Sequence, residues 1–457
     1  MRSSAERAAQ LRDGLPERYQ ALIQALLAWR RSEAGKAEIL YRAVLLNHPQ
    51  DIDAWLGLGE VRFHSGPLSG RSISAAKDAW ERVLFLDPKN RLAPVHLARI
   101  AALAGDTTSL TALPVLLPDA TPWDLSRSLE VMAWRAIVLR RPGELESVLA
   151  RLSQGTDATL LTTVWQLVIF SRDLETSERF VRLLLEPGRG AWLGHLGNLL
   201  LGHLHAAKGQ TRASEQKFRA TQGLREAGLT HEAYLATLPF LKATRSRTAR
   251  MREQVAALPS TVPAGSQVWT LEEDLRHPHL RPYLLGILSA ALGEGQPALR
   301  HAAELERTST TSEIAPLAQD FANEIRARVA IGEGRFAGAM KNLENIHVEA
   351  PWERTLVSPF FARAAARFLR AEMYRELGQY DLAREWYESL GELSPYEIVL
   401  LAPAHLRRAQ MHELQGENAL AAEQYERFIE LWRDCDPELR PTVEEARRGI
   451  ERMVRRS

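Results

Sequence analysis

Four places in the chain share one spacing, in which an alanine is followed twelve residues later by a proline. The four pairs are Ala37 and Pro49, Ala76 and Pro88, Ala339 and Pro351, and Ala383 and Pro395. In three of them an aromatic residue stands four positions after the alanine, as Tyr41, Trp80 and Tyr387. Self-similarity at a fixed spacing indicates a repeat architecture, in which each repeat is one structural unit.

Each shared position has a physical role in a pair of antiparallel helices. A small residue lets the two helices approach closely, and an aromatic four residues later lies on the same helical face and fills the space between pairs. Proline cannot continue a helix, so it ends the second helix of the pair. One hairpin cannot bury its apolar face alone, whereas several stacked hairpins form a continuous core. The spacing therefore predicts an all-α solenoid of stacked antiparallel helix hairpins, with almost no strand.

The repeat signature is clear towards both ends of the chain and weaker in the middle. We expect an N-terminal repeat block at 1–117, a degenerate helical-hairpin block at 118–258, a loop or linker at 259–280 and a C-terminal repeat block at 281–457. Five residues too many between Gly66 and Ala76 predict an insertion in an inter-helix turn. The polar segment 442–456 is typical of the capping helix that ends a solenoid.

The sequence resembles the tetratricopeptide-repeat family over most of its length. That family's pattern is W-x2-L-G-x2-Y, then A-x3-F, then P, over 34 residues. Tyr374, Ala383, Tyr387 and Pro395 fall in its slots. Residues 57–72 and 434–439 resemble, more narrowly, the repeat region of large bacterial signalling proteins, in which the repeats accompany a serine/threonine kinase or another output domain. The kinase elements H-R-D and D-F-G do not occur in this sequence, and no catalytic constellation stands out. We therefore expect a sensing or scaffolding chain whose output domain is supplied by another polypeptide.

Composition and charge narrow the classes of partner. Lys+Arg is 58 and Asp+Glu is 57, so the formal net charge is +1, which does not favour a dedicated nucleic-acid binder. The single cysteine, Cys435, excludes a disulfide framework and a cysteine-based zinc site. No run approaches 18 apolar residues, and the N-terminus has no apolar signal region. We therefore predict a cytoplasmic protein that does not span a membrane.

No catalytic or cofactor motif stands out. The phosphate-binding G-x-x-x-x-G-K-[ST] pattern is absent, and the glycines at 332–338 have the wrong spacing for a dinucleotide site. His195, His203 and His205 lack a ligand partner at helical spacing, so we interpret them as packing or interface residues. The arginines at 245–252 and 447–456 are interpreted as solvated helix faces. We expect no cofactor, no metal and no enzymatic activity.

Stacked hairpins form a concave wall from their first helices. The residues expected to face it stand one position after the small-residue slot of each first helix, or three to four positions later. This rule gives the candidate partner-binding residues Glu60, Phe63, His64, Arg99, Arg328, Glu372, Arg375, Gln410 and Glu413. The leading hypothesis is a non-enzymatic scaffold that binds a protein or peptide segment. The alternatives are an enzyme with a site assembled from distant residues and a solenoid that binds nucleic acid or a regulator.

Overall fold

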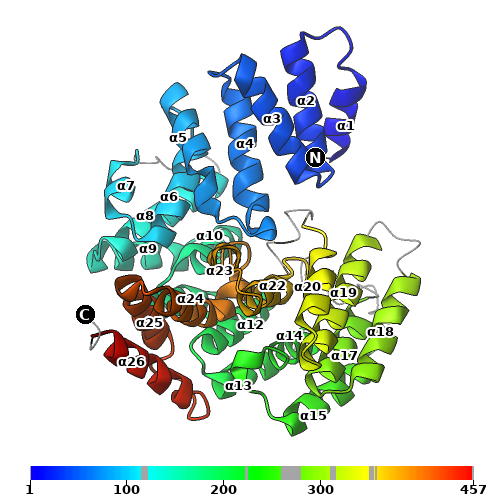
Figure 1. Cartoon of the computed structure of the whole chain (residues 1–457). Coiled ribbons are helices and arrows are strands. Elements are labelled where there is room, and N and C mark those ends of the chain that lie inside the picture. Colours follow the sequence, from blue (N-terminus) through cyan, green and yellow to red (C-terminus); the bar gives the residue numbers. More distant parts are fainter. Residues whose placement is uncertain are drawn as a thin grey trace. The chain divides into compact units, whose positions relative to one another are not determined.

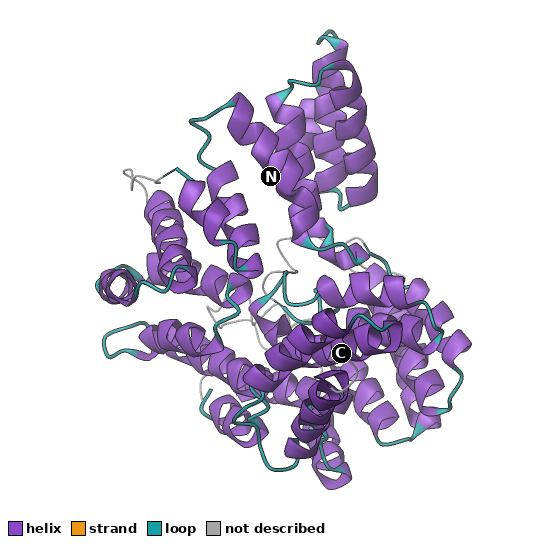
Figure 2. Cartoon of the chain, turned by 60° about the vertical axis from the view of Figure 1, so that its left-hand side comes forward, coloured by secondary structure: helices purple, strands orange, loops and turns teal. Residues whose placement is uncertain are grey.

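The structure, a computed structural model, describes residues 2–114, 122–221, 225–258, 279–308, 315–348, 355 and 358–454. In these ranges every regular element is an α-helix or a short 3-10 helix, and none is a strand (Figure 2). The all-α prediction is therefore confirmed. Within the same ranges, no helix combines the length and the apolar character needed to cross a membrane.

The helices pack into two compact units, Met1–Glu186 with Glu349–Leu356, and Pro187–Val348 with Val357–Ser457. The first contains α1 (Arg2–Gln10), α2 (Glu17–Arg30), α3 (Ala34–Asn47), α4 (Ile52–Ser65), η1 (Pro67–Ser69), η2 (Ile73–Ala76), α5 (Lys77–Leu86), α6 (Ala93–Ala104), α7 (Thr107–Ala112), α8 (Pro122–Val138), α9 (Pro142–Ser153), α10 (Asp157–Phe170), α11 (Leu174–Arg182) and η3 (Leu183–Leu185) (Figure 1).

The remaining helices belong to the second unit. It contains α12 (Ala191–Ala207), α13 (Thr211–Arg219), α14 (Arg225–Leu235), η5 (Pro239–Leu241), α15 (Arg245–Ala256), α17 (Leu280–Ala291), α18 (Gly295–Thr308), α19 (Ala315–Gly332), α20 (Phe336–Glu344), α22 (Ala364–Glu376), α23 (Tyr380–Glu388), η7 (Pro395–Leu400), α24 (Leu401–Gln415), α25 (Asn418–Leu431) and α26 (Arg440–Val454). The boundary between the units falls inside the middle block predicted at 118–258. Of the loop predicted at 259–280, residues 259–278 lie outside the described part of the chain.

Consecutive helices form the predicted hairpins, and the aromatic slot lies inside them. α2 packs on α3, α4 on α5, α22 on α23 and α24 on α25. The three aromatic residues of the Ala-to-Pro signature, Tyr41, Trp80 and Tyr387, are all buried, with at most 4% of their surface exposed. The polar helix α26 packs on α25 and ends the series, as predicted for a capping helix.

The prolines of the signature do not all end a second helix. α3 ends at Asn47 and α5 at Leu86, just before Pro49 and Pro88, as the pattern predicts. Pro395 behaves differently, because α23 has already ended at Glu388 and Pro395 is the first residue of η7. Pro351 lies outside the described residues. The insertion predicted after Gly66 forms the short helices η1 and η2.

In the hairpins of α12 with α13 and of α4 with α5, the aromatic ring of the second helix packs against the small residue of the first helix and leaves no room there for a larger side chain. A Cβ added to Gly202 on α12 would lie 2.4 Å from a ring carbon of Phe218 on α13. The equivalent atom on Gly59 would lie 2.8 Å from the Trp80 ring. Carbon atoms do not approach this closely, so the ring or a helix has to move when the slot is filled.

We expect Gly202→Ala to destabilise the second unit by about 1–3 kcal/mol, the usual cost of overpacking. Gly194 on the same helix is the matched control, because nothing lies within 4 Å of its added Cβ. Gly194→Ala should be neutral or stabilise the helix by about 0.5–1 kcal/mol, since alanine loses less backbone entropy than glycine. Urea unfolding of both variants measures the difference. Equal effects would mean that the slot does not set helix spacing.

The second unit contains contacts between segments far apart in the sequence. α12 packs against η7, although almost 200 residues separate them. The indole Nε1 of Trp432 donates to the carbonyl oxygen of Ala207 at 3.1 Å. Asp436 binds the start of α13: its carboxylate accepts from the hydroxyl of Thr211 at 2.6 Å and from the backbone amide of Arg212 at 3.1 Å. The last hairpin of this unit therefore returns to its first, instead of contacting only its neighbours.

Candidate functional site: polar clusters on the first helices

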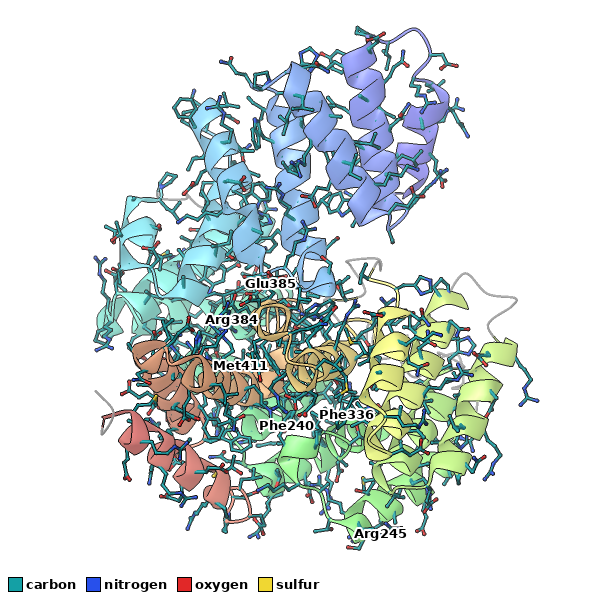
Figure 3. The ribbon with its side chains drawn as sticks, in the orientation of Figure 1. Phe240, Arg245, Phe336, Arg384, Glu385 and Met411 are labelled. Carbon is teal, nitrogen blue, oxygen red and sulfur yellow. The ribbon has the colours of Figure 1, made fainter. Side chains whose placement is uncertain are left out.

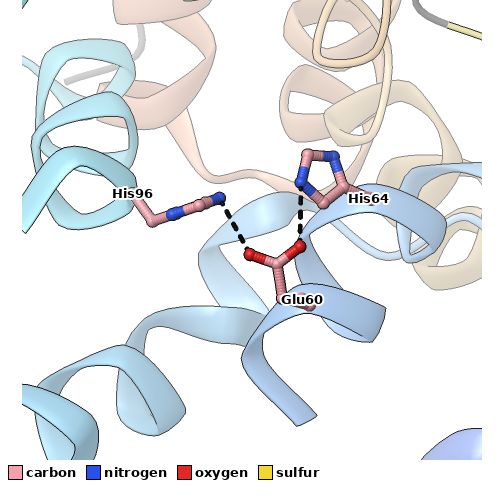
Figure 4. A group of neighbouring side chains, drawn as sticks. All are labelled: Glu60, His64 and His96. Carbon is pink, nitrogen blue, oxygen red and sulfur yellow. Dashed lines mark ion pairs between the residues drawn. The ribbon is translucent and has the colours of Figure 1, made fainter. Parts of the chain in front are cut away.

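Two imidazoles and a carboxyl group meet between α4 and α6 in the first unit. Glu60 and His64 are one turn apart on α4, and His96 comes from α6 (Figure 4). Nε2 of His64 lies 3.5 Å from Oε2 of Glu60, and Nε2 of His96 lies 3.7 Å from Oε1. One ligand atom from each residue lies within 4.8 Å of the others. The side chains are largely buried, with exposures of 15% for Glu60, 11% for His64 and 3% for His96.

Burial decides the charge state of these groups. It raises the pKa of Glu60 to about 7, against the opposing effect of the nearby Arg99 charge. It lowers the pKa of His64 to about 3, and Arg99 acts in the same direction. The pKa of His96 is also lowered well below its ordinary value by burial and by Arg99. Both imidazoles are therefore neutral at physiological pH.

The other two candidates near this cluster are not open to a partner. Phe63 is buried, and its ring packs edge-on against the His96 ring with centroids 4.5 Å apart. The guanidinium of Arg99 forms two hydrogen bonds with the carboxylate of Glu130, at 2.8 and 3.2 Å. Arg99 also lies over the ring of Phe170. The side chains of Phe63 and Arg99 thus contact neighbouring residues of the chain itself.

In the second unit Glu372 on α22 is held from two sides. Arg407 on α24 donates to both of its carboxylate oxygens, at 2.8 and 3.0 Å. The hydroxyl of Tyr387, in the aromatic slot of α23, donates to the same carboxylate. Nη2 of Arg375 lies 3.6 Å away. Burial and the Glu372 charge raise the pKa of Tyr387 well above its ordinary value. Glu372 thus links two successive hairpins.

A second set of contacts continues this arrangement towards the capping helix. Arg452 on α26 donates to both oxygens of Glu413 on α24, at 2.9 and 3.0 Å. The hydroxyl of Tyr425 on α25 donates to Glu413 at 2.8 Å. Gln410 accepts from Arg407 at 3.0 Å. We call this set the polar row; its members are Glu372, Arg375, Arg407, Gln410, Glu413 and Arg452.

The arginines of the polar row keep part of their surface open to solvent. Exposure of the side chain is 22% for Arg375, 31% for Arg407 and 46% for Arg452. The two glutamates are more enclosed, at 13% and 15%. A neighbouring molecule would therefore meet mainly guanidinium groups that are already held in position by carboxylates.

Arg328 lies away from any open surface. Its side chain on α19 is 8% exposed and pairs with Glu324 at 2.8 Å. Nη1 also donates to the carbonyl oxygen of Thr237 at 3.2 Å. Phe240, which follows Thr237 in the chain and is labelled in Figure 3, packs edge-on against Phe368 of α22, with ring centroids 5.3 Å apart. Arg328 therefore contacts the chain's own segment 237–241.

The arginines at 245–252 are largely paired. Arg247 lies 3.0 Å from Glu215 and 3.6 Å from Glu232, Arg252 pairs with Glu294, and Arg245 donates to the carbonyl of Leu292 at 2.8 Å. Arg250 lines a hollow of about 1140 Å³ between α13, α14 and α15. Of the second arginine cluster, Arg455 and Arg456 lie outside the described residues.

His203, which we interpreted as a packing or interface residue, is fully buried. Its Nε2 lies 2.8 Å from Nδ1 of His231 on α14, and the two rings meet edge to face. The ring of Tyr396, from η7, packs against both histidines. This pair of histidines therefore joins α12, α14 and η7 in the core of the second unit.

The slot rule found the glutamates of both clusters but missed their partners. His96 and Arg407 both stand two positions before the small-residue slot of the next first helix, at Ala98 and Ala409 respectively. Aligning the first helices on that slot would have shown that this column faces the preceding glutamate.

Parts of the chain match one family model, and the chain is similar to several solved structures. A family model described as tetratricopeptide repeat matches residues 22–70 and 352–398. Among solved structures, the APC/C hetero-tetramer Cut9-Hcn1 is 12% identical, over 97% of this chain and 92% of that chain, with a TM-score of 0.32. The yeast Tom70 structure is 12% identical, over 96% and 97%, with a TM-score of 0.34. No curated protein matches the chain. The two matched segments contain α3, α4, α22 and α23, and consecutive helices in them pack on each other, as they do in such repeats.

Proposed function

We propose that the chain is a non-enzymatic protein-interaction scaffold that binds a segment of another protein at the polar row. The observation that carries this proposal is the arrangement of the row itself. Side chains from α22, α24 and α26 form two neighbouring sets of contacts, one around Glu372 and one around Glu413, and three arginines in them remain partly exposed. Repeat proteins use extended surfaces of successive helices for recognition, and fixed guanidinium groups favour carboxylates and other planar acceptors.

The proposed binding surface contains fewer residues than the set of candidate partner-binding residues predicted from the sequence. Phe63, Arg99 and Arg328 are committed to internal contacts. Glu372 and Glu413 orient the arginines. Arg375, Gln410 and the arginines at 407 and 452 are then the residues that contact the partner. Glu60 and His64 belong to a separate cluster in the first unit.

The wider setting that we propose is a bacterial signalling system in the cytoplasm, with the output domain on another polypeptide. Its support is the resemblance of residues 57–72 and 434–439 to the repeat region of signalling proteins. Some of these residues also have structural roles, since Asp436 caps α13 and Gly66 precedes η1. A segment that orders on binding would be held with modest affinity.

The test of the scaffold is a pair of variants with opposite expectations. Arg375→Gln should weaken capture of the partner from a lysate of the source cells about tenfold, because one exposed interface arginine is worth about 1.4 kcal/mol or more. Arg427→Gln, at an exposed ion pair with Glu423 on the second helix α25, should leave capture unchanged. Quantitative mass spectrometry of the captured proteins measures both. Equal loss in the two variants would count against the polar row.

Glu372 is unsuitable for such a test. Its carboxylate receives the Tyr387 hydroxyl and two bonds from Arg407. Its replacement would leave these groups without their partner and lower stability. A loss of binding in a Glu372 variant would therefore not distinguish recognition from unfolding.

A further inference from the structure

The cluster of Glu60, His64 and His96 in the first unit can be compared with Glu372 and Arg407, which stand at the matching repeat positions in the second unit. In the repeat register Glu60 and Glu372 both stand one residue after the small-residue slot of a first helix. Glu372 is neutralised by Arg407, whose guanidinium donates two hydrogen bonds to it. The residue that occupies the position of Arg407 next to Glu60 is His96, and a second imidazole, His64, lies on the other side. The glutamate after the small-residue slot therefore pairs with an arginine in the second unit, whereas in the first unit it lies beside two histidines, whose imidazoles can bind metal ions.

His96 presents an unsatisfied nitrogen to this cluster. Its Nδ1 lies 3.1 Å from the carbonyl oxygen of Leu92. A carbonyl oxygen only accepts, so Nδ1 carries the hydrogen and Nε2 of the neutral ring presents a lone pair. Nε2 is buried without a hydrogen-bond partner and faces Oε1 of Glu60 at 3.7 Å. A cation placed between these atoms would convert two facing lone pairs into two ligand bonds.

We propose that Glu60, His64 and His96 form a binding site for a divalent transition-metal ion of the zinc class. Nitrogen and carboxylate ligands bind zinc at about 2.0–2.2 Å, which places the ligand atoms of a tetrahedral site about 3.4 Å apart. The contacts of 3.5 and 3.7 Å join the two histidines to different oxygens of Glu60. One ligand atom from each residue lies within 4.8 Å of the others, so the side chains have to move closer together to reach the tetrahedral spacing. Two histidines and one glutamate are also a ligand set that leaves a fourth position for water or another ligand.

The surroundings of the cluster suit a metal site. The hydrogen bond from Nδ1 of His96 to a backbone carbonyl is the outer contact that fixes the tautomer and orientation of a metal-binding histidine. Trp80 stacks on the His96 ring at 4.1 Å, with planes 12° apart, and holds it in place. The positive charges of Arg99, Arg30 and Arg127 act on Glu60, and Arg99 forms two hydrogen bonds with Glu130. The side chains of His64 and Glu60 are 11% and 15% exposed, whereas that of His96 is 3% exposed.

This site does not depend on the proposed scaffold function, and metal binding alone tests it. The full chain is stripped with EDTA and titrated with Co²⁺, whose visible absorption is intense in a four- or five-coordinate site and weak in water. We expect one equivalent to bind with the intense spectrum and to be displaced by Zn²⁺. Elemental analysis after gel filtration should give one zinc per chain.

Three variants assign the ligands. His64→Gln and His96→Gln should each weaken Zn²⁺ binding by about 100-fold or more, because loss of even an outer contact costs about 10–100-fold. His412→Gln is the matched control: His412 is a buried first-helix histidine hydrogen-bonded to Glu417, and its loss should change nothing. Circular dichroism checks folding, and the partly exposed His64 decides the outcome if the His96 variant unfolds. The proposal is overturned if the parent chain shows no stoichiometric Co²⁺ spectrum, or if His64→Gln retains the parent affinity.

Discussion

Replacing Tyr387 by alanine is expected to lower the free energy of unfolding of the second unit by about 3–5 kcal/mol, the usual cost of removing a buried aromatic side chain. Tyr387 is 2% exposed, and its ring meets that of Phe368 edge to face at 5.7 Å. The substitution removes the ring from the space between α22 and α23 and also removes the hydroxyl that binds Glu372. Urea unfolding followed by circular dichroism measures the change.

Tyr387→Phe separates the two contributions. It keeps the ring and removes only the hydrogen bond to the carboxylate, so we expect a loss of about 1.5–3 kcal/mol. Hydrogen exchange in the alanine variant should rise first in α22, α23 and α24, because repeats couple mainly to their neighbours. An alanine variant no less stable than the phenylalanine variant would show that the ring does not support the hairpin.

Replacing Trp432 by alanine is expected to loosen helices more than 200 residues away in the sequence. Trp432 is 1% exposed and its indole donates to the carbonyl of Ala207, at the end of α12. We expect a loss of about 3–5 kcal/mol. Hydrogen exchange should increase in α12 and at the start of α13, where Asp436 caps the helix.

Trp192 is the control for this substitution. It lies on α12 itself, but 38% of its surface is exposed. Trp192→Ala should therefore change stability by no more than about 0.5 kcal/mol, as is usual for surface positions. If Trp432→Ala increased exchange only in α25 and α26, the second unit would be an open series of hairpins without the return contact to α12.

The hairpins could be predicted from the sequence because their determinants are local. Ala383 and Tyr387 are four residues apart on one helix, so their roles follow from helical geometry alone. The return of Trp432 to Ala207 joins positions with no shared periodicity, so no pattern in the sequence indicates it. The same limitation applies to Pro395, which begins η7, because no pattern in the sequence indicates that this segment packs against α12.

For the candidate sites, too, the features within one helix could be predicted from the sequence, whereas the contacts with other segments could not. Glu60 and Glu372 were found because the slot rule describes one helix at a time. The rule also selected Arg328, whose side chain is 8% exposed and donates to the carbonyl oxygen of Thr237, and Phe63, which is buried. Whether a first-helix position stays open depends on which distant segment packs over it. His96 was missed for a different reason, because only a comparison between neighbouring first helices shows that it faces Glu60.

The central claim is that a protein segment binds along the polar row, and site-specific photo-crosslinking tests it most directly. A benzophenone amino acid is placed at Arg375 or Gln410 on the first helices, and at Glu388 or Arg427 on the second helices α23 and α25. After irradiation in source-cell lysate, both first-helix positions should crosslink the same protein, and excess unlabelled chain should abolish the product. Crosslinks formed only from Glu388 and Arg427 would contradict the claim.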